Sequence, residues 1–229
     1  FPILSANVVK AADNEPPGWT NVAPWTMLVV PGTTPPVKVG VIGLSTLDTP
    51  VFQRAGALDD LRFRKLADTV KEWTPKVRAA GADVVVVLAH EGGQCSRFDD
   101  PDDLSSCDKD SKLFRLVRAL SPRQIDLVIG GHSHRSVAHR VGGVPIIQGG
   151  AKARFFARAD LTYDPLHRKV TNIHLHRPVA VKEGGSYAGR RAVPSPKAVE
   201  ALLPFEEEVL RLKDRPIAAA AATPLTRQH

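Results

Sequence analysis

The sequence has no long apolar run, and none of its stretches approaches the roughly 18 consecutive apolar residues of a membrane-spanning helix. Phe1 is followed directly by the apolar residues 2–4, so no basic leader precedes the first apolar residues. The sequence also lacks an initiator Met. We therefore expect no membrane span in these 229 residues, and we expect them to begin inside a longer protein.

Charged residues are scattered along the chain. The net charge of +7 favours anionic partners such as phosphate esters. No run of Lys and Arg is longer than two residues, as at Arg190-Arg191, and basic residues do not alternate with aromatic ones, so a nucleic acid polymer is not an expected partner. The loop 99–110 holds six aspartates, but it lacks the central Gly and the spacing of a helix–loop–helix calcium site, and we interpret it as a solvated acidic loop.

The chain has only two cysteines, Cys95 and Cys107, and both lie in one polar loop. A disulfide between them would stabilise the fold by about 2–3 kcal/mol and would suit an exported protein. The alternative is two free thiols in a cytosolic loop. The polar surroundings favour the disulfide, and two cysteines alone do not make a structural zinc site, which needs four ligands.

Apolar runs predict a series of strands with helices between them. The run 82–89 is the strongest, since continuous β-branched residues indicate a strand buried on both faces. Apolar residues at three- to four-residue spacing predict helices over 65–80, with a kink or break at Pro75, and over 111–120. This order predicts a mixed α/β layered domain. The other predicted strands are 2–9, 27–30, 37–44, 125–130, 144–148, 158–163 and 167–177.

Three histidines follow two of the predicted strands. His90 comes directly after the strand 82–89, and His132 and His134 lie in the run Gly-Gly-His-Ser-His after the strand 125–130. Loops at the carboxyl ends of strands form the ligand crevice of open α/β sheets. Imidazole suits zinc, manganese or iron, and the glycine pair allows a sharp turn and close backbone approach. We therefore predict that these three side chains are metal ligands, whereas His139 is expected to be structural or to support the ligands.

Five segments occur in the order of a known family: FPILSANV (1–8), KVGVIGLSTLDTP (38–50), GADVVVVLAHEG (81–92), IDLVIGGHSH (125–134) and VPIIQGG (144–150). With them the chain resembles the metallophosphoesterase (calcineurin-like) superfamily, in its 5′-nucleotidase branch. The resemblance implies a four-layer α-β-β-α sandwich, of which residues 1–178 would be the C-terminal part. A linker with a helix would follow at 179–216, and the start of a C-terminal substrate-binding domain at 217–229.

The resemblance also implies a function and a site. It implies two divalent ions (Zn, Mn or similar), with His90 and His132 on one ion and His134 on the other, and it assigns no catalytic residue in this chain. The implied activity is hydrolysis of nucleotide phosphate esters by a metal-activated water in the periplasm or outside the cell. Alternatives are a UDP-sugar hydrolase, a cyclic-nucleotide phosphodiesterase or a thiosulfohydrolase of the same superfamily, or a non-catalytic remnant or binding module.

The sequence departs from the family in one respect. The family's Asp-x-His, Gly-Asp and Gly-Asn-His-Glu motifs do not occur in the 229 residues and are expected upstream of Phe1. Three imidazoles cannot hold two divalent ions and also supply the carboxylate that bridges them. We therefore expect this segment alone to be an incomplete site and to be inactive.

Overall fold

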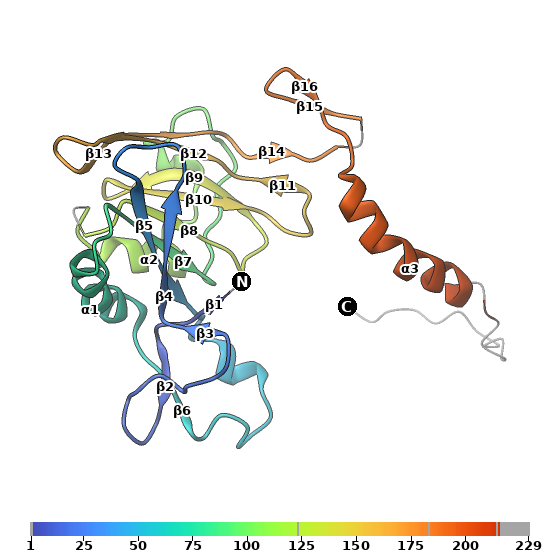
Figure 1. Cartoon of the computed structure of the whole chain (residues 1–229). Helices are drawn as coiled ribbons and strands as arrows, with labels where there is room; N and C mark the ends of the chain where they lie inside the picture. The colour runs from blue at the N-terminus through green and yellow to red at the C-terminus, as the bar shows by residue number, and fades with distance from the viewer. Residues whose placement is uncertain (1, 123, 183, 214, 216–229) are drawn as a thin grey trace. The chain divides into compact units, whose positions relative to one another are not determined.

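The computed structural model describes residues 2–122, 124–182, 184–213 and 215 (Figure 1). The chain divides into two compact units between Val181 and Lys182. The predicted start of a further domain at 217–229 lies outside the described residues.

Six strands form the central sheet of the first unit, and their order is β4-β5-β7-β8-β10-β9. The inner strands β5, β7, β8 and β10 run parallel to one another, and the edge strands β4 and β9 are antiparallel to their neighbours. Four carboxyl ends therefore lie at one edge of the sheet. The bounds are β4 Trp25–Val30, β5 Val37–Leu44, β7 Val84–Ala89, β8 Leu127–Ile129, β9 Ser136–Val141 and β10 Val144–Gly149.

Both faces of this sheet are covered. Helices α1 (Leu66–Ala79) and α2 (Lys112–Arg118) pack on one face, and the hairpin of β12 (Ala159–Asp164) and β13 (Lys169–Leu175) packs on the other. Side chains of β7 alternate between the two cores: Val85 and Val87 lie on the helix side, and their neighbours 84 and 86 on the hairpin side. The prediction of a buried strand in a mixed α/β fold is confirmed, and the complete four-layer sandwich stays a prediction.

The remaining short elements of the first unit lie around this core. They are β1 Ile3–Leu4 with β3 Val22–Ala23, β2 Val8–Lys10 with β6 Leu61–Phe63, β11 Phe155–Phe156 with β14 Val179–Ala180, and the 3₁₀ turns η1 Thr49–Phe52 and η2 Leu104–Ser106. Helix α1 continues through Pro75, so of the predicted kink or break the break does not occur, and the kink stays a prediction.

The predicted strand 2–9 is in fact two strands, β1 and β2, in different sheets. Asn7 lies between them and is fully buried. Its side chain accepts a hydrogen bond from the Ser45 N–H (2.8 Å) and donates one to the Ser45 carbonyl (2.9 Å). A buried amide must be satisfied in this way, so the chain at Asn7 bonds to the loop after β5 instead of continuing one strand.

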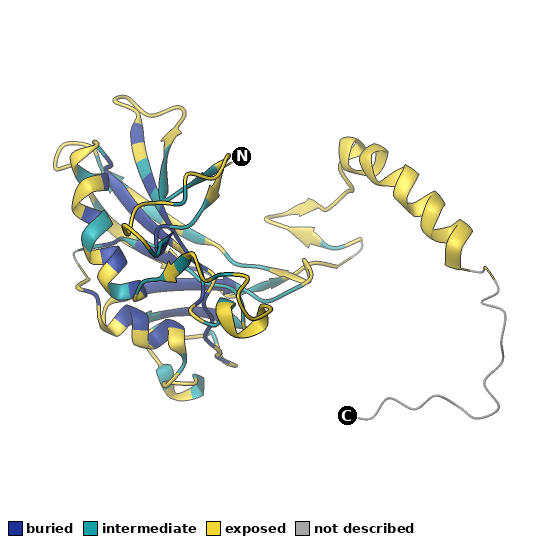
Figure 2. Cartoon of the chain, turned by 90° about the horizontal axis from the view of Figure 1, so that it is seen from below, coloured by how far each residue is buried: buried dark blue, intermediate teal, exposed yellow. Residues whose placement is uncertain are grey.

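The second unit contains β15 (Ser186–Tyr187), β16 (Arg190–Arg191) and helix α3 (Pro196–Lys213). The helix predicted within 179–216 is present, and its role as a linker stays a prediction. None of the described residues of α3 is buried, and the helix is exposed along its length (Figure 2). Among the described residues, no helix combines the length and the apolarity that crossing a membrane requires.

Candidate metal centre

The carboxyl ends of the four parallel strands place four loops side by side. In sheet order these loops contain Asp48 after β5, His90 and Glu91 after β7, the run 130–135 after β8, and 150–154 after β10. Such a row of loops at one edge is where open α/β sheets bind ligands.

The imidazoles of His90 and His132 lie together. Nδ1 of His132 is 3.2 Å from Nε2 of His90, and the ring centroids are 4.8 Å apart with the planes at 65°. They approach each other because β7 and β8 are adjacent in the sheet, so that each ring starts from a neighbouring strand end.

This spacing fits a shared cation. Two imidazole nitrogens that each lie 2.0–2.1 Å from one tetrahedral zinc ion are about 3.3 Å apart, close to the 3.2 Å observed. The same distance also fits a hydrogen bond between the two rings. The nitrogens of His90 and His132 are therefore spaced as ligands of the divalent cation that the sequence predicts.

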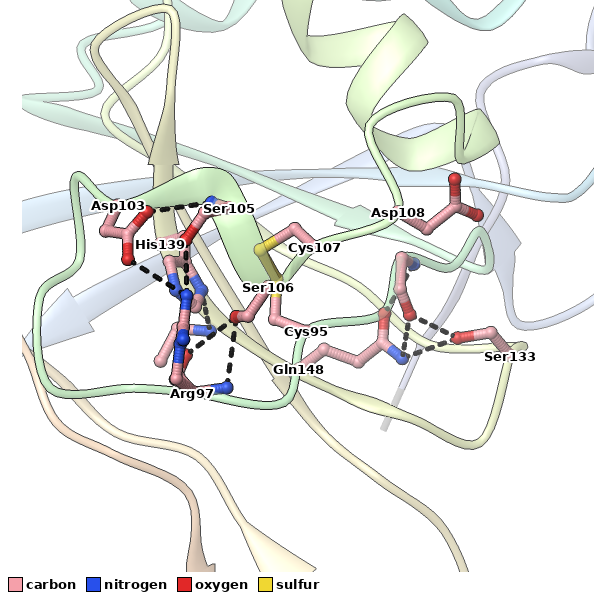
Figure 3. Close-up of a disulfide and its surroundings, with 12 residues drawn as sticks. Cys95, Arg97, Asp103, Ser105, Ser106, Cys107, Asp108, Ser133, His139 and Gln148 are labelled. Atoms are coloured by element: carbon pink, nitrogen blue, oxygen red, sulfur yellow. Dashed lines mark hydrogen bonds and ion pairs between the residues drawn. A yellow bond between two sulfur atoms is a disulfide. The ribbon is translucent and has the colours of Figure 1, made fainter.

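The two loops are held against each other by the buried side chain of Gln148 (Figure 3). Its Oε1 accepts a hydrogen bond from the Gly93 N–H (3.1 Å), and its Nε2 donates to Ser133 Oγ (2.8 Å) and to the carbonyl of Arg135 (2.6 Å). Ser133 Oγ in turn donates to the Gly93 carbonyl (2.7 Å). One residue of β10 thus fixes the spacing of the His90 loop and the His132 loop.

The loop after β8 turns sharply. His132 and His134 both have left-handed backbone conformations, with φ of 66° and 58°, which are uncommon for residues other than Gly. The loop passes so close to Gly92 that a Cβ there would lie 2.4 Å from the Ser133 side chain. The glycine after the His90-Glu91 pair is therefore required by packing.

His134 differs from the other two predicted ligands. Its side chain is exposed and lines a cavity of about 550 Å³. No ring contact or hydrogen bond recorded among the described residues joins His134 to His90 or His132. The structure thus brings two of the three imidazoles together, and the role of the third stays a prediction.

Two carboxylates beside His132 were not singled out as ligands from the sequence. Oδ2 of Asp48 lies 3.8 Å from Nε2 of His132 and forms an ion pair with Lys112 of α2. Ligand atoms of Asp48, Glu91 and His132 all lie within 4.8 Å of one another. The hydrogen bond from Lys112 is the main reason that the pKa of Asp48 is lowered. The sequence could have indicated both carboxylates by their position, because Asp48 and Glu91 each follow a predicted strand, as the histidines do.

The Glu91 carboxyl is almost completely buried, at 2% exposure. It accepts a hydrogen bond from Thr46 Oγ1 at 3.2 Å, and the same hydroxyl accepts one from the N–H of Asp48. These contacts tie the loop after β5 to the loop after β7. The segment that contains Asp48 is therefore part of the same packed group of loops.

The predicted disulfide between Cys95 and Cys107 is present (Figure 3). His139 of β9 is fully buried next to it, and burial is the main cause that lowers the pKa of this imidazole. The two sulfur atoms are bonded to each other, and Cys95 and His139 are both buried, so His139 packs here as a structural residue.

Comparison with known proteins gives the class of this fold. No family model matches the chain. The 2′,3′-cyclic-nucleotide 2′-phosphodiesterase/3′-nucleotidase of Haemophilus influenzae is 33% identical over 136 residues, which are 59% of this chain and 19% of that protein. The UshA protein of Yersinia enterocolitica is 25% identical over 91% of this chain and 40% of its own length. The chain thus spans well under half of the curated relatives it matches.

The solved structure of the calcineurin-like phosphoesterase YfkN from Bacillus subtilis superimposes with a TM-score of 0.70, at 19% identity, over 94% of this chain and 64% of that one. The chain therefore shares its α/β fold with this structure. Its relatives in sequence are a phosphodiesterase/nucleotidase and UshA proteins, and the solved structures similar in fold include 5′-nucleotidases and a calcineurin-like phosphoesterase; the chain covers only part of each.

Proposed function

We propose that this chain is part of a metal-dependent phosphohydrolase that hydrolyses nucleotide phosphate esters in the manner of a 5′-nucleotidase. The main support is the 3.2 Å approach of His90 Nε2 and His132 Nδ1 at the carboxyl edge of the sheet. Relatives named as nucleotide phosphoesterases support the substrate class. The positive net charge of +7 favours such anionic substrates.

In this proposal His90 and His132 hold one divalent ion (Zn, Mn or similar), and His134 holds a second. When bound, two such ions would lower the pKa of an attacking water and neutralise the phosphoryl oxygens. Asp48 Oδ2 lies 3.8 Å from the ring nitrogen of His132 that points away from His90, so its negative charge would favour a cation on that imidazole.

We further propose that these residues alone form an incomplete two-metal site. Three imidazoles supply no bridging carboxylate, and Asp48 is already paired with Lys112. The division into a metal-domain part at 1–178, a linker at 179–216 and the start of a substrate domain at 217–229 is part of the same proposal. So is export to the periplasm or the cell exterior, which the disulfide supports.

A second candidate is a cyclic-nucleotide phosphodiesterase, because the relative with 33% identity is named as one. Both candidates use the same metal ligands and differ in substrate. Hydrolysis of 2′,3′-cyclic AMP compared with that of AMP separates them.

The first experiment measures bound manganese or zinc in the purified protein. The wild-type chain should bind metal weakly, and His132→Ala should abolish this binding, because one of two converging nitrogens is lost. His174→Ala is the matched control, since His174 is an exposed histidine of β13. In the longest native form of the protein, full AMP hydrolysis by His132→Ala would show that the site is assigned wrongly.

A further inference from the structure

The disulfide has a third side chain of a metal-binding type beside it. His139 of β9 lies next to Cys95 and Cys107 (Figure 3), and one ligand atom from each of the three residues lies within 4.8 Å of the others. The sequence indicated only the two sulfur atoms at this place, which are too few for a zinc site. The structure therefore adds an imidazole to them, and this imidazole comes from a different element of the fold.

The imidazole of His139 has an unused nitrogen. Its ring is fully buried, and within the described part of the chain its Nε2 atom has no hydrogen-bond partner. The other nitrogen, Nδ1, faces the N–H of Ala138 at 3.4 Å. Buried polar atoms without a partner are rare in folded proteins, so Nε2 is the atom of this group that gains most from a ligand.

The surroundings of this ring favour a metal ion. Burial is the main cause that lowers the pKa of His139, so the imidazole is neutral at neutral pH. Neutral imidazole is the form that coordinates metals. The carboxylates of Asp103, Asp100 and Asp102 oppose the effect of burial, because their negative charges favour positive charge at the ring. A bound cation gains from these charges while the ring itself stays neutral.

Backbone hydrogen bonds hold the two cysteines in place independently of the bond between their sulfur atoms. The N–H of Cys95 donates to the carbonyl of Ser136 (3.0 Å), and the N–H of Asp108 donates to the carbonyl of Gln94 (2.9 Å). Cys95 and Cys107 face each other as an antiparallel pair, with Cα atoms 4.0 Å apart. Two sulfur atoms on one tetrahedral zinc ion are about 3.8 Å apart. Side chains that extend in parallel from these two positions reach that spacing.

Solvent reaches this group from one side. Cys95 lines the cavity of about 550 Å³ that also contains His134, and a cavity of this size holds water. A zinc ion with two cysteines and one histidine completes its tetrahedron with a water molecule. Three side chains thus supply three ligands, and the cavity supplies the fourth.

We propose that Cys95, Cys107 and His139 bind a zinc ion when the disulfide is reduced, so that the metal replaces the disulfide as the cross-link of the loop 95–107. A dithiol supplies the two electrons and two protons that convert the S–S bond into two thiols, and the dithiol itself becomes a cyclic disulfide. Zinc binding then releases both thiol protons, because the thiolate is the ligand. In the oxidised chain the sulfur atoms are bonded to each other, and His139 only packs against them.

The test uses the His132→Ala chain, which lacks the candidate metal centre, reduced with dithiothreitol and then freed from it under argon. Titration with Co²⁺ should give the near-ultraviolet absorption of cobalt–thiolate bonds and the visible bands of tetrahedral cobalt, and one equivalent of Zn²⁺ should remove both. The oxidised chain should show no thiolate absorption. Zn²⁺ should also raise the urea midpoint of the reduced chain toward that of the oxidised chain.

The decisive variant is His139→Phe in the same chain, which keeps an aromatic ring beside Phe98 but removes the nitrogen. It should lower the affinity of the reduced chain for zinc about a hundredfold or more, since even residues that only support metal ligands change the affinity about 10–100-fold. The matched control His174→Ala removes an exposed histidine of β13 and should leave this affinity unchanged.

X-ray absorption at the zinc edge identifies the ligands without any exchange of His139, and so decides the question even if His139→Phe does not fold. The expected shell has two sulfur atoms at about 2.3 Å and one imidazole nitrogen at about 2.0–2.1 Å. The site is refuted if Co²⁺ gives no thiolate absorption, if His139→Phe binds zinc as tightly as its parent, or if the zinc ion has four sulfur neighbours from two chains.

Discussion

Gln148 offers the sharpest test of how the candidate metal centre is held together. Replacement by Met preserves an unbranched side chain of similar length but removes the amide. The buried Gly93 N–H then has no partner, and Ser133 Oγ and the Arg135 carbonyl each lose one hydrogen bond. A buried donor left unpaired costs about 1–3 kcal/mol, and each of the two other lost bonds costs about 1 kcal/mol, so Gln148→Met should destabilise the fold by about 3–5 kcal/mol.

Urea unfolding followed by circular dichroism measures this change. With a slope of about 2 kcal/mol/M, the unfolding midpoint should decrease by about 1.5–2.5 M. Bound metal should also decrease, because the His90 and His132 loops lose the residue that sets their spacing. Gln94→Met is the control, since it makes the same chemical change at an exposed position of the His90 loop. If Gln148→Met shifts the midpoint no more than Gln94→Met does, the reasoning is wrong.

The remaining predictions concern the disulfide, the metal centre and the loss of stability at low pH. Replacing both Cys95 and Cys107 by Ser should lower the free energy of unfolding by about 2–3 kcal/mol, and an unchanged urea midpoint would contradict this. Asp48→Asn should weaken manganese or zinc binding about tenfold, because it removes a negative charge 3.8 Å from an imidazole ligand; equal affinity in a metal titration would contradict this. The hydrogen bond from Arg158 is the main cause that lowers the pKa of Asp160 to about 2. The ionised Asp160 carboxylate stabilises the fold at pH values above its unfolded-state pKa of about 3.8. This stabilisation is lost as the pH decreases through the folded-state pKa of about 2, so Asp160→Asn should reduce the loss of stability in acid. Identical urea midpoints of variant and wild type at neutral and acid pH would argue against it.

Local chemistry made much of the fold predictable. The run 82–89 is so uniformly β-branched that only a strand covered on both faces suits it, and β7 is such a strand. The two cysteines in a polar loop indicated the disulfide that is present. The 2–9 segment was predicted wrongly as one strand, because the bond of Asn7 to Ser45 joins positions 38 residues apart and leaves no local pattern.

The candidate site was also predictable only in part. Histidines at the ends of two apolar runs are visible in the sequence, and so is the glycine-rich turn that contains His132 and His134. What the sequence could not give is distance: that the nitrogens of His90 and His132 come within 3.2 Å, or that Asp48 lies beside the second ring.

The sequence by itself determined which residue types follow which strands, since strand propensity and apolar runs depend on neighbours along the chain. Only the tertiary structure decided which loops meet, because the strand order of the sheet places β7 beside β8 and the buried amide of Gln148 bonds Gly93, 55 positions away. For the same reason, the basic side chains of the loop after β10 became part of a cavity beside His134 only once the sheet was formed.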